Sequence, residues 1–316
     1  MIDSKINNLF INEEVNKYLD NVIKTNSFSN GYIFYGEEGI GKKQTAFRFI
    51  QEIFKKSLLS KNIEERILNK NHPDLLIIEP SSSIKSKQSK SLENYNLEVI
   101  KIEQVRNIKI FLSQKPLESD MKIVFIDNAH LLNEAASNCL LKTLEEPNNG
   151  IFILKTSKLN LLLDTIKSRC QLVKFKSFSS KKIENLVNEN LDSSLSKSKI
   201  NKNLNFQDLV NLANGSPGKL LNKIQIWNEL SDDILVKLET PLNNELEIFK
   251  ISKLITERLE IFQQISLIEY LQFLWWRKTN NANLVKKLEK LKFHLRNFIQ
   301  PRLAWEVVLL QIAIEL

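Results

Sequence analysis

A glycine-rich run followed by lysine stands near the start of the chain. Residues 35–47 read YGEEGIGKKQTAF, and an apolar stretch, 31–35, directly precedes the glycines. The pattern G-x-x-x-x-G-K-[ST] of a phosphate-binding loop fits from Gly36 through Lys42. It fails at its last position, where Lys43 replaces the hydroxyl that binds magnesium. The run therefore predicts a polyphosphate cradle that lacks part of its metal site.

Glycine is rare in the rest of the chain, which strengthens this interpretation. Only seven glycines occur in 316 residues, and four of them, at 31, 36, 39 and 41, surround this loop. A chain that uses glycine so sparingly is expected to keep it where φ is positive or where the backbone approaches a ligand closely. We predict that Gly36, Gly39, Gly41 and Lys42 form a degenerate nucleotide site, at which ATP binding without hydrolysis stays possible.

A second polar group follows the apolar run KIVFID at 122–127. Asp127 ends this run, where a carboxylate can reach a metal beside a phosphate loop. In an active ATPase of this kind the next residue is usually a glutamate that polarises the attacking water. Here it is Asn128, whose amide cannot accept a proton, and Lys43 adds a cation that can pair with Asp127. The two changes predict that no residue of this site acts in hydrolysis in cis.

Short apolar runs alternate with helical stretches over residues 1–175, and this alternation predicts a parallel sheet with crossover helices. Continuous apolar runs suit strands that are buried on both faces. From about 178 onwards the apolar residues recur at three- and four-residue spacing, which predicts helices to the end of the chain. The expected strands are residues 32–35, 74–79, 122–127, 151–157 and 171–175.

Composition limits the function further. The net charge of +8 is mild and spread over many lysines, which indicates a solvated surface. Apolar runs are too short to span a membrane, and no signal peptide opens the chain, so we expect a cytoplasmic protein without membrane contact. Cys139 and Cys170 are too few for a disulfide framework or a four-thiolate site. His72 has no partner ligands and is expected to hold the turn before a strand, and the Ser/Lys-rich segment 81–90 predicts a mobile loop.

Sequence runs along most of the chain resemble the clamp-loader branch of the AAA+ family. The resemblance is most specific at 122–175, which contains LLKTLEEP and SRC at the family's spacing. Segments 71–80, 100–116, 215–221 and 300–310 are similar to a subunit of the bacterial DNA polymerase III clamp loader.

The resemblance implies a RecA-like AAA+ domain at 1–175, a small helical lid at 176–225 and an all-α collar domain at 226–316 that oligomerises. It implies work within a DNA polymerase holoenzyme, in the complex that opens the sliding clamp and closes it on primed DNA. The implied partners are motor and clamp-opening subunits, the clamp, and DNA through the complex. The implied role is that of an ATP-incompetent scaffold, often called a stator.

The resemblance also implies roles for single residues. Thr156 matches the family's first nucleotide sensor, whereas Gly218 stands where motor subunits carry a sensing arginine. Arg169, which follows Ser168 in SRC, enters a neighbouring subunit's ATP site in this family and acts there in trans. Residues 48–71 contain no cysteine, so the zinc module of many relatives is not expected and no zinc is predicted.

Several alternatives stay open at the level of sequence. Glu145 and Glu146 can reach a neighbouring subunit or can be exposed charges at a helix end. A motor ATPase of the same branch would carry Thr or Ser at position 43 and Glu at position 128, and this chain carries neither. An independent DNA-binding protein would show a basic stripe with interleaved aromatics, and its affinity would fall steeply with salt.

Overall fold

The computed structural model describes residues 12–56, 62–82, 98–147, 150–183, 185, 206–230, 232–297 and 299–315. The chain folds as two compact units, Met1–Phe178 and Ser179–Leu316. The predicted mobile loop at 81–90 lies outside the described residues, except for Ser81 and Ser82.

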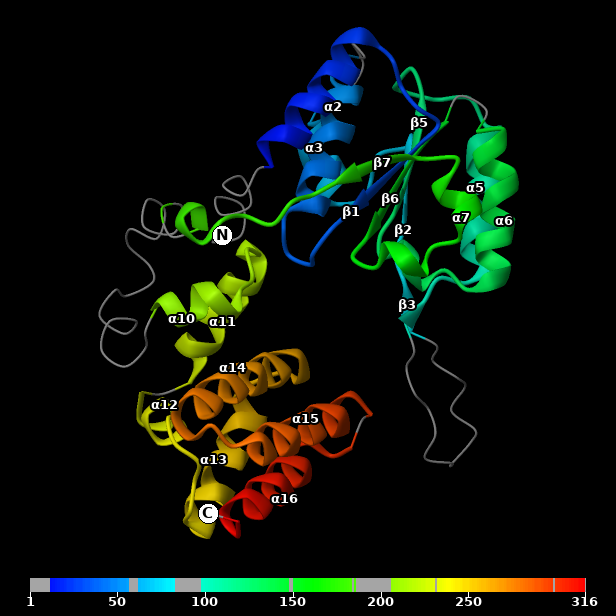
Figure 1. The fold of residues 1–316 in the computed structure, drawn as a ribbon. Coiled ribbons are helices and arrows are strands. Elements are labelled where there is room, and N and C mark those ends of the chain that lie inside the picture. The colour runs from blue at the N-terminus through cyan, green and yellow to red at the C-terminus, as the bar shows by residue number, and fades with distance from the viewer. Residues whose placement is uncertain are drawn as a thin grey trace. The chain divides into compact units, whose positions relative to one another are not determined.

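A five-stranded parallel sheet forms the centre of the first unit (Figure 1). The strands lie in the order β2-β5-β6-β1-β7. They are β1 (Gly31–Tyr35), β2 (Leu75–Ile78), β5 (Lys122–Ile126), β6 (Gly150–Thr156) and β7 (Gln171–Lys174). All five predicted strands and their parallel pairing are thus confirmed. A separate antiparallel pair joins β3 (Ser81–Ser82) to β4 (Glu98–Val99).

Helices cover both faces of this sheet (Figure 1). One face carries α2 (Glu13–Thr25), α3 (Lys42–Phe54) and α4 (Ile63–Leu68). The other carries α5 (Ile102–Ser113), α6 (Glu134–Glu145) and α7 (Asp164–Lys167). Short 3-10 turns η1 (Ala129–Leu131) and η2 (Leu159–Leu161) follow β5 and β6.

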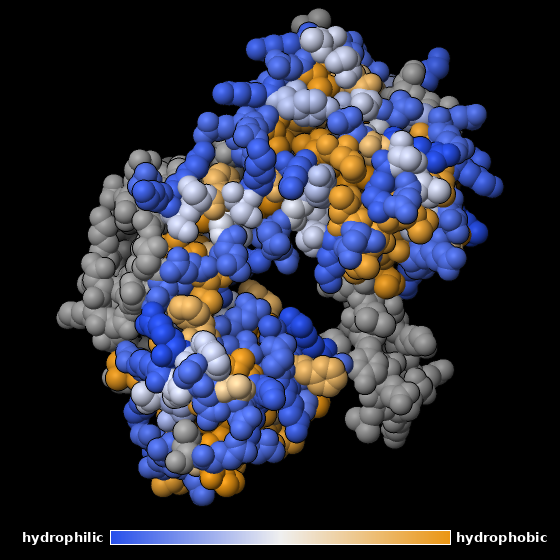
Figure 2. Space-filling model, viewed as in Figure 1, coloured by the Kyte–Doolittle hydropathy of each residue, from blue (hydrophilic) through white to orange (hydrophobic). Residues whose placement is uncertain are grey.

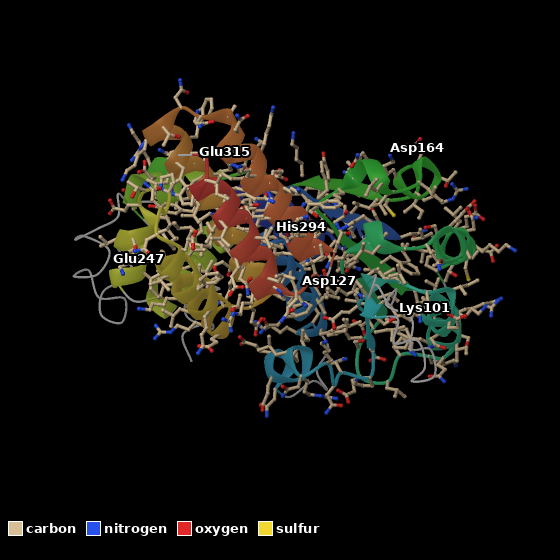
Figure 3. All side chains as sticks on the ribbon, turned by 90° about the horizontal axis from the view of Figure 1, so that it is seen from below. Lys101, Asp127, Asp164, Glu247, His294 and Glu315 are labelled. Atoms are coloured by element: carbon tan, nitrogen blue, oxygen red, sulfur yellow. The ribbon has the colours of Figure 1, made fainter. Side chains whose placement is uncertain are left out.

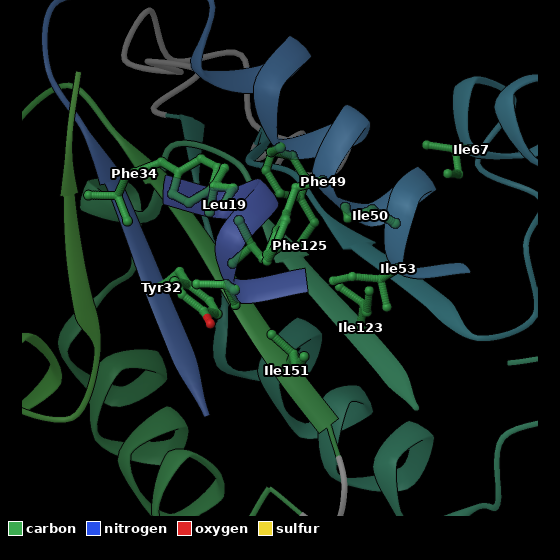
Figure 4. Packing of buried hydrophobic residues seen from close by; sticks show 14 of the residues in the cluster. Leu19, Tyr32, Phe34, Phe49, Ile50, Ile53, Ile67, Ile123, Phe125 and Ile151 are labelled. Atoms are coloured by element: carbon green, nitrogen blue, oxygen red, sulfur yellow. The ribbon is translucent and has the colours of Figure 1, made fainter. Parts of the chain in front are cut away.

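Two apolar clusters, one on each face, hold the layers together. Successive strand residues point to opposite faces, so Tyr32 and Phe34 pack beneath α3 while Ile33 packs on the side of α6. Figure 4 shows the first of these clusters, in which the rings of Tyr32 and Phe49 meet edge to face with centroids 5.5 Å apart. Burial on both faces explains why the strands are continuous apolar runs rather than alternating ones.

The sequence His-Pro-Asp before β2 forms a structural turn. His72 is buried and its ring stacks on Phe54, with centroids 4.2 Å apart. The carboxylate of Asp74 accepts hydrogen bonds of 2.8 to 2.9 Å from the backbone N–H groups of residues 117–119 and from the Ser119 hydroxyl. Asp74 therefore ties the start of β2 to the turn that precedes β5.

Asp74→Asn is expected to lower the free energy of unfolding by about 3 kcal/mol at pH 7, because several charge-assisted hydrogen bonds are lost. Burial would raise the pKa of Asp74, but the hydrogen bonds from residues 117–119 outweigh it and hold this pKa below its usual value. The stabilisation is therefore present above about pH 4 and is lost as the pH falls through the lowered pKa. Denaturant unfolding of both proteins as a function of pH tests this; a gap that widens in acid would contradict it.

The second unit consists of packed helices in its described part (Figure 1). They are α10 (Phe206–Leu212), α11 (Pro217–Glu229), α12 (Asp232–Leu238), α13 (Glu245–Arg258), α14 (Ile261–Thr279), α15 (Ala282–Arg296) and α16 (Pro301–Ala313). Across the described residues of the chain, no helix has the length and apolar character needed to cross a bilayer.

Contacts within the second unit join the predicted lid to the predicted collar. Lys223 of α11 is buried and its ammonium lies 3.9 Å from the Glu269 carboxylate on α14. Arg277 of α14 pairs with Asp208 of α10 at 2.7 Å. The lid and collar boundary near 225 stays a prediction, and both sides of it belong to one compact unit.

Two tryptophans of the second unit form part of its core. Trp275 donates a hydrogen bond of 2.9 Å to the Leu238 carbonyl, and Trp305 donates one of 2.9 Å to the side chain of Gln264. Both side chains are buried, and they serve packing rather than contact with a ligand. Figure 2 shows mainly hydrophilic residues on the visible surface of both units, with hydrophobic residues in smaller patches.

Candidate functional site

The glycine-rich loop connects β1 to α3. Gly36, Gly39 and Gly41 all have positive φ, at 145°, 77° and 88°. A side chain at Gly36 would place its Cβ 2.5 Å from the carbonyl oxygen of Phe175, so only glycine fits there. Helix α3 begins at Lys42, so its N-terminus directly follows the loop. The loop therefore has the backbone shape of a phosphate cradle.

Lys42 is bound to its own loop. Its ammonium donates hydrogen bonds of 2.6 Å to the carbonyl of Gly36 and 2.5 Å to that of Glu37. The residue is only 3% exposed. Burial, with a smaller effect of nearby Lys155, lowers the pKa of Lys42 to about 8. To hold a phosphate, Lys42 would have to give up both carbonyls.

Three polar side chains stand in one row at the carboxyl ends of adjacent strands. The register that pairs Ile126 of β5 with Leu154 of β6 places the following residues, Asp127 and Lys155, beside each other. The register between β2 and β5 places Glu79 on the other side of Asp127. All three continue the side-chain alternation that faces α3, so they meet the start of that helix.

Ion pairs connect this row to lysines on both sides. Asp127 binds Lys155 through one carboxylate oxygen at 2.5 Å and Lys43 through the other at 3.1 Å. Lys43 also pairs with Glu79 at 3.1 Å, and Glu79 pairs with Lys70 at 2.5 Å. We call Lys155, Asp127, Lys43, Glu79 and Lys70 the ion-pair chain. Asp127, labelled in Figure 3, directly follows Ile126, the last residue of β5. The pairing of Lys43 with Asp127 that the sequence suggested is present.

The charges of the ion-pair chain stabilise each other. Burial would raise the pKa of Asp127, but Lys155 and Lys43 outweigh it and leave this pKa below its usual value. Burial would lower the pKa of Lys43, but Glu79 and Asp127 outweigh it and raise this pKa. Lysine on each side thus keeps Asp127 charged at neutral pH.

The residues present do not fit the magnesium ion that usually accompanies ATP at such a site. Magnesium needs oxygen ligands in near-octahedral geometry, and both oxygens of Asp127 already accept from ammonium groups. Asn128 adopts a left-handed conformation, with φ 50°, and its side-chain oxygen lies 3.4 Å from the Lys155 ammonium. In the described part of the chain, no group of three or more His, Cys, Asp or Glu residues could hold a metal.

Thr156, matched to the first nucleotide sensor, is engaged locally. Its hydroxyl lies 3.2 Å from Nδ1 of His130 and accepts a hydrogen bond of 3.0 Å from the N–H of Lys158. The residue is buried. Its role as a sensor stays a prediction, as does the loss of a sensing residue at Gly218, which lies in the first turn of α11.

Arg169 lies at the amino-terminal ends of the strands, whereas the loop lies at their carboxyl ends. It precedes β7, whose first residue Gln171 pairs with Tyr32, whereas the loop starts beyond Tyr35 at the other end of β1. The guanidinium makes hydrogen bonds of 3.0 and 2.5 Å to one oxygen of Glu145, and their side chains are 36% and 52% exposed. Arg169 is therefore outside the reach of this chain's own loop and accessible to another molecule.

The other predicted interface residues lie at the same end of the strands as Arg169. The hydroxyl of Ser168 donates to the Thr165 carbonyl at 3.1 Å, and Arg169 donates to that carbonyl at 3.0 Å. Glu146, which follows the last residue of α6, is exposed. The interface role of Ser168, Arg169, Glu145 and Glu146 stays a prediction.

Three members of the ion-pair chain, Lys155, Glu79 and Lys70, are not among the residues predicted from sequence. In the run IFILKTS, Thr156 matches a family position, whereas Lys155 is only one residue of the predicted strand 151–157. The signal that could have found Lys155 and Glu79 is their place at the ends of predicted parallel strands. Carboxyl ends of neighbouring strands meet at one edge, and charged residues there are candidates for a shared site.

A phosphate-type loop after the first strand of a parallel sheet, an aspartate at the end of another, and a helical part beyond define an α/β AAA+ protein. The same fold occurs in the crystal structure of a DNA polymerase III gamma subunit-related protein from Thermotoga maritima. That structure matches with a TM-score of 0.55 at 18% identity, over 94% of this chain and 98% of the other.

Two family models cover most of the sequence. One, described as DNA polymerase III, delta subunit, matches residues 11–179. The other, described as the C-terminal domain of cyanobacterial DNA polymerase III delta prime, matches residues 189–312. The chain belongs to the DNA polymerase III delta-prime family.

Individual relatives agree with this family. DNA polymerase III subunit delta' of Bacillus subtilis is 31% identical over 207 residues, which are 63% of this chain and 58% of that protein. The delta' subunit of Haemophilus influenzae is 45% identical over 74 residues, 23% of each chain. The subunit tau of Bacillus subtilis is 32% identical over 190 residues, 57% of this chain and 30% of tau. The matched regions thus span less than two thirds of these relatives.

Proposed function

We propose that this chain is the delta-prime subunit of a DNA polymerase III clamp loader, and that it acts as a stator without ATP hydrolysis of its own. In this role it helps to load the sliding clamp onto primed DNA in the cytoplasm. Its partners are motor and clamp-opening subunits, and it reaches the clamp and the DNA through the complex. Membership of the delta-prime family supports this assignment.

The single observation that carries the stator role is the pairing of Asp127 with two lysines. In an ATPase this carboxylate serves a metal that neutralises charge on the transferred phosphoryl group. A carboxylate whose two oxygens both accept from ammonium groups is not free to coordinate such a metal. The residue after Asp127 is Asn128, whose amide cannot act as a general base. Both features argue against the alternative of an active motor subunit.

The purified chain alone is expected to show no ATPase activity above that of its Lys42→Ala variant. The reason is that Lys43 replaces the metal-binding hydroxyl and Asn128 replaces the base, while the carboxylate of Asp127 is occupied by ammonium groups. A phosphate-release assay in magnesium at several ATP concentrations measures this. Magnesium-dependent turnover that Lys42→Ala abolishes would identify a motor subunit instead.

Assembly is expected to depend on the second unit. The first unit carries its own two apolar clusters, so a fragment of residues 1–178 is expected to fold. It lacks the helical part in which the family resemblance places the collar. Mixing the fragment or the full chain with the partner subunits, followed by native mass measurement, compares the two. Equal incorporation of the fragment would contradict the collar assignment.

A further inference from the structure

Lys155 and Lys43 hold Asp127 from two different elements. Lys155 comes from β6, a central strand, and Lys43 from the first turn of α3. Each takes a different oxygen of the carboxylate. Asp127 is thereby bound from the sheet and from the helix at once, in the position where a metal would otherwise join the loop to the strand.

We infer that the ion-pair chain replaces the magnesium ion of this fold, and that Lys155 is the residue that chiefly determines the exclusion of metal from Asp127. This inference goes beyond the lack of hydrolysis, which the changes at positions 43 and 128 already predict. It also stands apart from the clamp-loader role, because it concerns what the isolated chain binds.

Burial distinguishes the two lysines. The side chain of Lys155 is 17% exposed and that of Asp127 is 8% exposed, whereas Lys43 is 38% exposed. Lys155 is fixed by its strand, and its pair with Asp127 is weakly screened. Lys43 lies nearer to solvent and divides its ammonium between Asp127 and Glu79. Restoring a hydroxyl at position 43 alone would therefore leave Asp127 bound by Lys155.

A divalent ion at this place would meet both ammonium groups at short range. Repulsion between like charges a few ångströms apart is large where water is excluded. The nearby Lys42 adds a further positive charge. A polyphosphate that the loop binds would instead be neutralised by these lysines directly. The ligand class that fits is a nucleotide polyphosphate without metal, and added magnesium should not improve its binding.

The test measures binding of a fluorescent ATP analogue to the full chain in EDTA and in magnesium. For the unaltered chain we expect no tightening of Kd by magnesium. For Lys43→Thr/Lys155→Met we expect magnesium to tighten Kd by about tenfold or more, because two repelling charges are gone and a hydroxyl is restored. Lys43→Thr alone should gain less than the double variant.

A matched control removes two lysines far from the loop in the fold. Lys109→Thr/Lys142→Met changes two exposed lysines of α5 and α6, which cover the other face of the sheet from α3. It lowers the net charge equally and should not gain magnesium dependence. Magnesium tightening of at least about tenfold in the unaltered chain would overturn the inference, even if the double variant does not fold. A folded double variant without magnesium gain, or an equal gain in the control, would also overturn it. Each of these failures would leave the assembly role untouched.

Discussion

Arg169→Ala should slow ATP hydrolysis at the neighbouring motor subunit's site by about 10³-fold, while this chain still folds and enters the complex. A guanidinium delivered in trans stabilises charge that develops on the γ-phosphoryl group in the transition state. The alternative role, a surface ion pair with Glu145, is worth about 1 kcal/mol or less and would leave hydrolysis unchanged.

The placement of Arg169 agrees with the role in trans. It lies at the amino-terminal ends of the strands, away from the chain's own loop, and its guanidinium is partly exposed. The pair with Glu145 is exposed too, so releasing the guanidinium to another subunit costs little. Glu145 at 3.0 and 2.5 Å orients the side chain before assembly.

Two variants separate charge from geometry. Arg169→Lys keeps the charge but loses the planar fork, so it is expected to resemble Arg169→Ala in single-turnover hydrolysis by the complex. Glu145→Gln keeps Arg169 and is expected to change hydrolysis by less than about tenfold, since it affects orientation alone. Wild-type hydrolysis and clamp loading with Arg169→Ala, in a complex shown to contain it, would reject the role in trans.

Asp127→Asn should lower the free energy of unfolding of the first unit by about 3 kcal/mol, because a mostly buried Lys155 loses its partner. If the carboxylate were instead kept free for a metal, Asp127→Asn would raise the free energy of unfolding, because it would remove charge repulsion in the metal-free protein. The direction of the change therefore separates an ion-pair anchor from a metal ligand. Asp164→Asn is the matched control, since Asp164 is 97% exposed and should change stability by less than about 0.5 kcal/mol.

The two units offer separate signals for this experiment. All four tryptophans, at 227, 275, 276 and 305, belong to the second unit. Tryptophan fluorescence in denaturant should therefore stay unchanged in Asp127→Asn. Hydrogen exchange of peptides from β5 and β6 should become faster. Unchanged exchange in these strands would show that Asp127 does not anchor the sheet.

The sheet could be predicted from sequence because its strands are buried on both faces. Such strands are short apolar runs, and their ends are marked by charged or turn-forming residues. β5 was expected at 122–127 and spans Lys122–Ile126. The loop was equally readable, because its glycines are needed for positive φ, which Gly36, Gly39 and Gly41 all adopt.

The ion-pair chain was only partly predictable. Lys43 and Asp127 stood out because they occupy known positions of a pattern, and their pairing followed from charge alone. The position of Lys155 beside Asp127 follows only from the register between β5 and β6. This register depends on strand order and cannot be predicted from local sequence. Lys70 depends on the turn before β2 for its place beside Glu79. Long-range pairing, rather than propensity, decides such contacts.

The most direct test of a stator role is clamp loading by a reconstituted complex with Lys42→Met in this chain. The variant removes the loop ammonium and keeps a residue that suits a helix, and circular dichroism is used to check that it folds. For a stator we expect that omission of this chain abolishes loading and that Lys42→Met supports loading at the wild-type rate. If a folded and incorporated Lys42→Met chain loses loading as completely as omission of the chain does, this subunit needs its own nucleotide site and is not a stator.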